Sequence, residues 1–315
     1  MYKDIITIST VTLAPMWGQK ERNLNRIEGY IEAAAKRGSD LVLFPEMGLT
    51  GYDDETDVEL EQKMQYRLAE EPSGHACTEL AELAKGLGIY AFVGMPIREP
   101  SGVPGTPDTI YNGLAASSPE GLVGVYRKMH LPNDEPNWAT RGDSPMIVDS
   151  PWGPIGLGIC YDSYRFPELS RYYAAKGCRL YLNPTALAFG PGRATFGSAA
   201  LEAIAIRDGM FVVSANLGGQ DLLNRFWGGS SIIGPGSRDS EAHYYAGMPF
   251  TADGASEEAM YTATVDLALA KRQLFRKNAR IGASDWRPDR YLEMLQDVLA
   301  DGPFATEDGP EPEDA

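Results

Sequence analysis

Short apolar runs outnumber the helical segments of this chain, and several follow one another with no helix between them. Residues 89–97, 110–116 and 122–127 are three consecutive runs of this kind, each with the length and residue types of a β-strand. A winding in which one helix follows every strand does not fit this order. Two β-sheets packed together, with helices on their outer faces, fit it better, and we predict this α/β arrangement.

The remaining patterns complete this prediction. Further strands are expected at residues 5–11, 40–44, 155–160, 180–182, 210–215, 230–233 and 261–265. Helices are expected at residues 23–36, 78–85, 166–176, 197–207, 267–275 and 288–299. No internal repeat or Gly/Ser-rich linker divides residues 1–300, so we predict one domain there. Residues 301–315 are rich in proline, glycine and acidic side chains, which predicts a disordered tail.

The net charge, the apolar stretches and the cysteines of the chain limit which partners, cofactors and compartment are expected. A net charge of −16 over 315 residues argues against nucleic acid and anionic membranes. No apolar stretch is long enough to span a bilayer, and the first residues lack a secretory signal pattern. Cys77, Cys160 and Cys178 form neither a Cys-x-x-Cys pair nor a zinc-binding spacing. Because this sparse, odd count is typical of reduced thiols, we expect a cytoplasmic protein without a metal or cofactor.

Three predicted strands end at a residue that is capable of catalysis. Glu46 follows the strand at 40–44, Lys128 follows the strand at 122–127, and Cys160 ends an apolar run that passes into a turn. Because strand ends at one edge of a sheet converge, we predict that this carboxylate, ammonium and thiol share one cleft.

The chemistry of such a trio is the hydrolysis of an amide or nitrile by a thiol. Glu46 would remove the proton of Cys160, and the thiolate would attack the substrate carbon. Lys128 and the backbone N–H of Tyr161 would stabilise the oxyanion. Glu46 would then return the proton to the departing amine and activate water for thioester hydrolysis. Each of these residues alone is weak evidence for a catalytic site, because a lone cysteine after an apolar run is more often part of a core.

The motifs around the three residues make the prediction specific. They read Phe-Pro-Glu-Met-Gly-Leu-Thr-Gly-Tyr at 44–52, Tyr-Arg-Lys-Met-His-Leu-Pro at 126–132, and Gly-Ile-Cys-Tyr-Asp at 158–162 followed by Phe-Pro-Glu. Weaker segments at 181–185 and 214–216 agree in order and spacing. With these motifs the chain resembles the nitrilase (carbon–nitrogen hydrolase) superfamily, in its amidase-like branch, over residues 4 to 275.

This resemblance implies a four-layer αββα sandwich that pairs with a second copy into an αββα-αββα homodimer. It also implies a catalytic triad of Glu46, Lys128 and Cys160 that acts on a small-molecule amide. Family members often carry a second glutamate after the lysine, and Glu135 is the best match, with Asp134 as its rival.

Some residues near these motifs are interpreted as bystanders. We interpret His130, in the lysine motif, as structural. Cys77 and Cys178 lie at helix ends and are also interpreted as lying outside the chemistry.

The residues after Cys160 bear on the substrate. Tyr-Asp follows it where true nitrilases usually have Trp-Glu, which favours amide over nitrile hydrolysis. Cys-Tyr-Asp with Arg-Phe-Pro-Glu resembles amidases of the ω-amidase kind, but the gap before Arg165 is one residue longer here. Arg165 and Arg193 are equally candidates to bind a substrate carboxylate or to form internal salt bridges. The other candidate pocket residues are Tyr52, Trp138, Asn183, Phe189 and Trp227.

Several functions remain open at this point. The favoured one is a thiol amidohydrolase that releases ammonia from a small amide. N-carbamoyl compounds and nitriles are alternative substrates, because the same trio can attack their carbon. A catalytically silent binding or scaffold relative would be expected to lack part of the triad, whereas all three residues are present.

Overall fold

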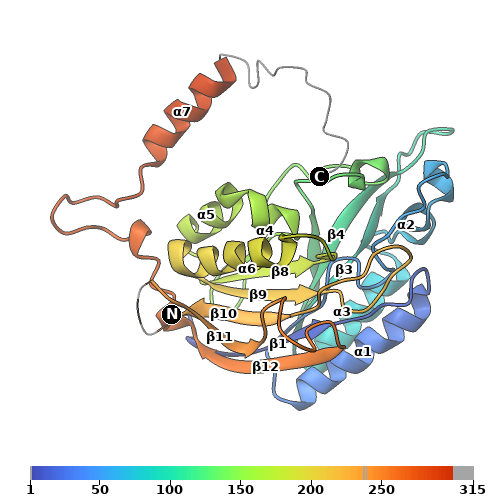
Figure 1. Cartoon of the computed structure of the whole chain (residues 1–315), viewed down its shortest axis with the longest axis horizontal. Coiled ribbons are helices and arrows are strands. Elements are labelled where there is room, and N and C mark those ends of the chain that lie inside the picture. The colour runs from blue at the N-terminus through green and yellow to red at the C-terminus, as the bar shows by residue number, and fades with distance from the viewer. Residues whose placement is uncertain (1, 237, 239, 301–315) are drawn as a thin grey trace. The chain divides into compact units, whose positions relative to one another are not determined.

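Two six-stranded β-sheets pack together in a computed structural model that describes residues 2–236, 238 and 240–300 (Figure 1). The first sheet has the order β12-β1-β2-β3-β4-β5 and the second the order β11-β10-β9-β8-β7-β6. The strands of the first sheet are β1 (Ile5–Thr12), β2 (Leu41–Leu43), β3 (Tyr90–Glu99), β4 (Thr109–Ser118), β5 (Gly121–Arg127) and β12 (Ala259–Asp266). Those of the second are β6 (Ile147–Val148), β7 (Ile155–Leu157), β8 (Leu180–Thr185), β9 (Phe211–Asn216), β10 (Ser231–Pro235) and β11 (Ala242–Gly247).

The two sheets share one plan. Parallel strands form the centre of each sheet, namely β1, β2 and β3 in the first and β7, β8 and β9 in the second. Antiparallel strands complete the sheets on both sides. The parallel strands β2 and β7 lead to Glu46 and Cys160, whereas Lys128 follows the antiparallel strand β5.

Helices cover the outer face of each sheet. α1 (Lys20–Lys36) and α3 (His75–Leu87) pack against the first sheet, and α5 (Pro167–Ala175) and α6 (Arg193–Ala203) against the second. α1 buries one stripe of side chains at helical spacing, namely Leu24, Ile27, Ile31 and Ala34. The predicted packing of two sheets with helices outside is therefore confirmed.

The contact between the sheets is partly polar. β1 lies opposite β9 and β10 across this contact. The Thr10 hydroxyl donates to the carbonyl oxygen of Ser214 at 2.8 Å, and the Thr12 hydroxyl donates to Ser230 Oγ at 2.7 Å. These hydroxyls are fully buried, so the bonds satisfy groups that would otherwise be costly to bury.

Shorter helices connect the main elements. They are η1 (Leu60–Gln62), α2 (Met64–Leu68), η2 (Glu135–Asn137), α4 (Tyr161–Arg165), η3 (Ile204–Asp208) and η4 (Leu267–Leu269). α6 begins at residue 193, four residues before the predicted start, and continues into the π-helical turn η3. β6, β11 and α2 were not predicted, because each is short or only partly buried and shows little periodicity.

The predicted helix at 267–275 is wrong. Residues 267–269 form only the 3-10 turn η4, in which the Asp266 carboxylate accepts the N–H of Ala268. Arg272 then adopts a φ of 44°, a left-handed conformation that a continuing α-helix of L-residues does not tolerate. The compact unit that carries both sheets ends at this residue.

A second unit begins at Gln273. It contains η5 (Gln273–Phe275) and α7 (Pro288–Ala300), so the helix predicted at 288–299 is confirmed. The predicted tail at 301–315 lies outside the described residues. Among the described helices, none is long and apolar enough to cross a membrane.

Candidate active site

Glu46 lies in a tight turn directly after the buried strand β2. Gly48 N–H donates to the carbonyl oxygen of Pro45, and Met47 adopts a φ of 54°. The turn rests on Gly94 in β3, where a Cβ atom would lie 2.3 Å from the Pro45 oxygen and 2.8 Å from the Glu46 Cα. Only glycine leaves room for this contact, so Gly94 fixes the position of Glu46.

Lys128 follows β5 and is fully buried. Its Nζ donates to Glu46 Oε1 at 2.7 Å and to Glu135 Oε2 at 2.7 Å. Its backbone N–H donates to the Asn112 carbonyl oxygen, and its own carbonyl oxygen accepts the N–H of Gly142. The ammonium is therefore held between two carboxylates on a backbone that is itself fixed.

Glu135 is the glutamate that meets the lysine, and Asp134 is exposed to solvent. Glu135 begins the turn η2 and is 4% exposed. Its Oε2 also accepts the hydroxyl of Tyr52 at 2.8 Å. The geometry thus favours Glu135 over Asp134 as the second acidic residue of the cluster.

Asn112 completes the cluster and was missed in the sequence. Its Nδ2 donates to Glu46 Oε1 at 2.8 Å and to Glu135 Oε1 at 2.9 Å. It lies inside β4 and is fully buried. The available signal was a single amide within a strand of otherwise apolar or small residues, which by itself does not point to a site.

Cys160 follows β7 at a strained position, with φ 50° and ψ −102°. Its N–H donates to the Pro184 carbonyl oxygen at 2.9 Å, and α4 begins at the next residue. Its thiol is hydrogen-bonded to Thr185, whose Oγ1 also accepts the Tyr164 hydroxyl at 2.9 Å. A non-glycine residue in such a conformation needs a surrounding structure that enforces it.

The carboxylate of Asp162 supplies part of that structure. Its Oδ2 accepts the N–H of Ile159 and the hydroxyl of Tyr126, and its Oδ1 accepts the N–H and the Nδ1–H of His130. The His130 ring in turn stacks on the Phe166 ring, with ring centroids 3.6 Å apart. Asp162 thus connects the turn that carries Cys160 to the segment that follows Lys128. His130 contributes to this connection as a structural residue.

Burial and charge set the protonation of the cluster. Burial disfavours the Lys128 ammonium, but the charges of Glu135 and Glu46 outweigh it and raise the pKa of Lys128. Burial, with the Glu46 charge as a second cause, raises the pKa of the Cys160 thiol, against the opposing effect of Lys128. Burial also raises the pKa of Glu135. At neutral pH the ammonium is therefore charged and the thiol protonated, so a nearby base is needed to ionise the thiol.

The other predicted pocket residues differ in their surroundings. Asn183 is buried in β8 and donates to Ser214 Oγ at 3.1 Å. Trp138 is 5% exposed in an apolar cluster with Met47. Phe189 is partly exposed and stacks on Trp227, with ring centroids 3.9 Å apart.

Neither predicted arginine reaches the cluster through a contact in the described part of the chain. The Arg165 guanidinium lies 4.3 Å from the Phe196 ring centroid. The Arg193 side chain lies against Gly190. Within the described residues neither arginine forms a salt bridge, so both remain candidates for binding a substrate acid group.

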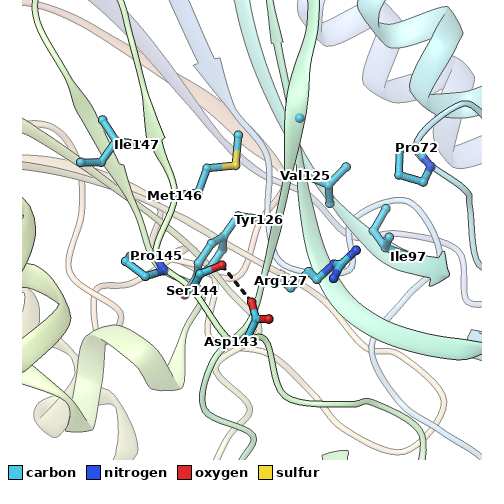
Figure 2. Close-up of a pocket in the computed structure, with 11 residues that line it drawn as sticks. Pro72, Ile97, Val125, Tyr126, Arg127, Asp143, Ser144, Pro145, Met146 and Ile147 are labelled. Carbon is cyan, nitrogen blue, oxygen red and sulfur yellow. Dashed lines mark hydrogen bonds between the residues drawn. The ribbon is translucent and has the colours of Figure 1, made fainter.

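A separate cavity of about 590 Å³ lies beside β5 (Figure 2). Val125, Ile97 and the segment 143–147 line it, and Figure 2 shows the hydrogen bond between Ser144 and Asp143, two of these lining residues. Neither Glu46 nor Cys160 is among its lining residues. This cavity is therefore not the candidate active site.

A family model described as carbon–nitrogen hydrolase matches residues 7–272. The chain belongs to this family. The prediction of the nitrilase superfamily is confirmed, and the protein is a hydrolase that acts on carbon–nitrogen bonds other than peptide bonds. Its fold is that of solved nitrilase-superfamily amidases: an amidase from Nesterenkonia sp. is 22% identical with a TM-score of 0.68, over 94% of this chain and 98% of that chain.

Relatives of this nitrilase-superfamily hydrolase carry two kinds of name. The omega-amidase NIT2 of Homo sapiens is 31% identical over 231 residues, which cover 69% of this chain and 76% of that protein. A nitrilase of Pyrococcus abyssi is 28% identical over 233 residues, which cover 73% of this chain and 82% of that protein.

Proposed function

We propose that this hydrolase cleaves a small amide to ammonia and a carboxylic acid through a thioester on Cys160. The observation that carries the proposal is the buried cluster of Glu46, Lys128 and Glu135, whose Glu46 and Lys128 charges act on the Cys160 thiol. A thiol that stays protonated needs a base as it attacks, and a buried carboxylate beside it supplies one.

In the first half of the reaction the Cys160 sulfur attacks the amide carbon while Glu46 takes the thiol proton. The Lys128 ammonium and the Tyr161 backbone N–H stabilise the oxyanion, and each such donor lowers the barrier by about 3–4 kcal/mol. The carbon–nitrogen bond then breaks, and Glu46 passes its proton to the departing nitrogen, which leaves as ammonia. A thioester on Cys160 remains.

In the second half water attacks the thioester carbon and gives a proton to Glu46. The carbon–sulfur bond breaks, the proton returns to the Cys160 sulfur, and the carboxylic acid leaves. Glu135 acts as a supporting residue, because it holds Lys128 and accepts the Tyr52 hydroxyl. The charge of Glu135 keeps the Lys128 ammonium ionised also while Glu46 carries the proton.

The substrate pocket is proposed to involve side chains near this cluster and on the loops beyond it. Arg165 and Arg193 are the proposed partners of an acid group on the substrate, since arginine binds carboxylates through two parallel hydrogen bonds. The other proposed pocket residues are Tyr52, Trp138, Asn183 and Phe189.

The known relatives support an amide over other substrates. Several relatives are named omega-amidases. The structural neighbour from Nesterenkonia sp. has been solved with acrylamide, and a mutant of it carries the acetamide moiety of fluoroacetamide at its active site cysteine. The Pyrococcus abyssi relative, named a nitrilase, makes nitrile hydrolysis the second candidate.

We propose further that the protein is a homodimer of the four-layer sandwich and acts in the cytoplasm. The three free cysteines support a reducing compartment, because none forms a disulfide. Sedimentation of the full chain at micromolar concentration tests the dimer, and a monomer throughout would contradict it.

The experiment that tests the function is a screen for ammonia release with the wild-type protein and Cys160→Ala. Aliphatic amides, ω-amides, N-carbamoyl amino acids and nitriles serve as substrates. We expect an amide to be the best substrate and the variant to release no ammonia. Cys178→Ala is the matched control. Burial also raises the pKa of this thiol, to about 12, but no charge of the Lys128 cluster contributes to the shift. Full activity of Cys160→Ala would overturn the mechanism.

A further inference from the structure

The two oxygens of Glu46 have different surroundings. Oε1 accepts two hydrogen bonds, from Lys128 Nζ at 2.7 Å and from Asn112 Nδ2 at 2.8 Å. Oε2 is buried and accepts no hydrogen bond from the described part of the chain. A carboxylate oxygen without a donor in a buried site is costly, and such exceptions occur where a group is kept for chemistry.

Asn112 is held firmly in the position from which it reaches Glu46. It lies in the middle of β4, paired with Pro96 of β3, and its carbonyl oxygen accepts the Lys128 N–H at 2.8 Å. Its side-chain partners Glu46 and Glu135 are both carboxylates. Because an ionised carboxylate only accepts hydrogen bonds, the amide nitrogen and not the amide oxygen must face them.

We infer that Asn112 is a positioning residue that fixes which oxygen of Glu46 acts as the base. Its N–H and the Lys128 ammonium together occupy Oε1, which leaves Oε2 to take the proton of Cys160 and later that of water. The inference rests on the proposed function, since it concerns the base of that reaction.

The physical argument depends on how a carboxylate turns. The terminal torsion of a glutamate is broad, so one ammonium donor alone can bind either oxygen or both. The second donor, from Asn112, comes from a fixed strand and favours a single orientation of Glu46. The same amide group also donates to Glu135. It therefore fixes the positions of both carboxylates that share the Lys128 ammonium.

A double-mutant cycle tests this role. Asn112→Leu has nearly the same size as asparagine and lacks both donors. We expect it to lower kcat by about 10- to 100-fold with little change in KM, because misplacing a general base costs part of its 10²- to 10⁴-fold effect. In a Glu46→Gln background, which has no base to orient, Asn112→Leu should cause little further loss of kcat.

Two outcomes would overturn the inference. One is a kcat for Asn112→Leu equal to that of the wild type. The other is an equal fold-loss of kcat in both backgrounds, since a general structural effect adds independently of Glu46. If Glu46→Gln and Cys160→Ala both kept full activity, the proposed function itself would fail, which is a distinguishable result.

Folding is controlled in the same experiment. Ser170→Ala removes a buried hydroxyl that donates to Asp208 in the outer helix layer, and it should lower the melting temperature with kcat unchanged. If Asn112→Leu does not fold, Asn112→Ser, which keeps one donor, replaces it in the cycle. We expect a smaller loss of kcat from this variant, again only when Glu46 is present.

Discussion

Two buried ionic clusters in this protein have opposite characters. At the candidate site, the Lys128 ammonium is fully buried between Glu46 and Glu135, and Glu46 Oε2 has no donor in the described residues. In the outer helix layer, the buried Asp208 carboxylate is paired with Arg171 and Arg207, whose side chains are 25% and 34% exposed.

The difference between the two clusters shows which of them has the properties of a catalytic site. Asp208 has both oxygens engaged, by the two arginines and by the hydroxyl of Ser170. Its cations stay partly in water, so the cluster loses little hydration. The cluster at Lys128 leaves one acceptor of Glu46 unpaired, and the Glu46 charge acts with burial to raise the pKa of the Cys160 thiol. Groups with such perturbed pKa values gather at functional sites more often than in structural ion pairs.

The largest expected effect comes from removing the buried cation. Lys128→Met should lower kcat by about 10²- to 10³-fold through loss of oxyanion stabilisation. It should also lower the free energy of unfolding by about 3–5 kcal/mol, because two buried carboxylates lose their partner. Ammonia release and urea unfolding measure the two effects.

The matched variant in the other cluster is Arg171→Met. We expect kcat within twofold of the wild type and a change in unfolding free energy of about 1 kcal/mol or less, since this cation is partly exposed. Equal losses of kcat from Lys128→Met and Arg171→Met would show that the two clusters do not differ in role.

A smaller effect is expected from moving Glu46 while keeping its charge. Gly94→Ala places a Cβ atom 2.3 Å from the Pro45 carbonyl oxygen, so the turn that carries Glu46 must shift. A displacement of about 1 Å can cost about 10²-fold in rate. Steady-state kinetics should show this loss mainly in kcat.

Gly29→Ala is the control for that substitution. Gly29 lies in α1, and a Cβ there meets no atom within 4 Å. It should leave kcat unchanged and raise the unfolding free energy by about 0.4–1 kcal/mol. If Gly94→Ala kept wild-type kcat, the close contact between Gly94 and the turn that carries Glu46 would be unimportant for the reaction.

The smallest expected effect concerns a carboxylate buried without a cation. Asp221 forms no ion pair within the described residues, and burial raises its pKa to about 6, although it accepts the N–H groups of Tyr52 and Asp53. A raised pKa means that the folded protein prefers the protonated acid. The stability from this group is therefore full below about pH 4 and is lost as the pH rises through about 6.

Asp221→Asn should remove this pH dependence. We expect the variant to gain about 1–3 kcal/mol over the wild type at pH 8 and to lose that advantage at pH 4. Urea unfolding at both pH values measures it. A constant difference between the two proteins across this range would contradict the assignment to Asp221.

Much of the candidate site could be predicted from the sequence because its residues follow strands. Glu46 and Cys160 follow the apolar parallel strands β2 and β7, one in each sheet, and Lys128 follows the antiparallel strand β5. Glu135 was predicted only through the motif of the family. Asn112 was missed because it lies within a strand, where nothing in the pattern distinguishes an amide that faces two carboxylates from one that faces solvent.

The fold was predictable in its layers and less so at its margins. The long periodic helices and the apolar strands carried a strong signal, whereas β6 and β11 were too short or too exposed to show one. The break after Leu269 depends on a left-handed backbone at Arg272, which neither composition nor periodicity indicates. Local conformations imposed by tertiary contacts are the part that a single sequence does not reveal.

The central claim is that the buried cluster serves Cys160 as a nucleophile. The most direct test is intact-mass measurement of the protein quenched during turnover of a slow amide. We predict a mass increase equal to the acyl group, mapped to Cys160 by peptide analysis and absent from Cys160→Ala. Turnover without any adduct under these conditions, or an adduct on a different residue, would contradict the account.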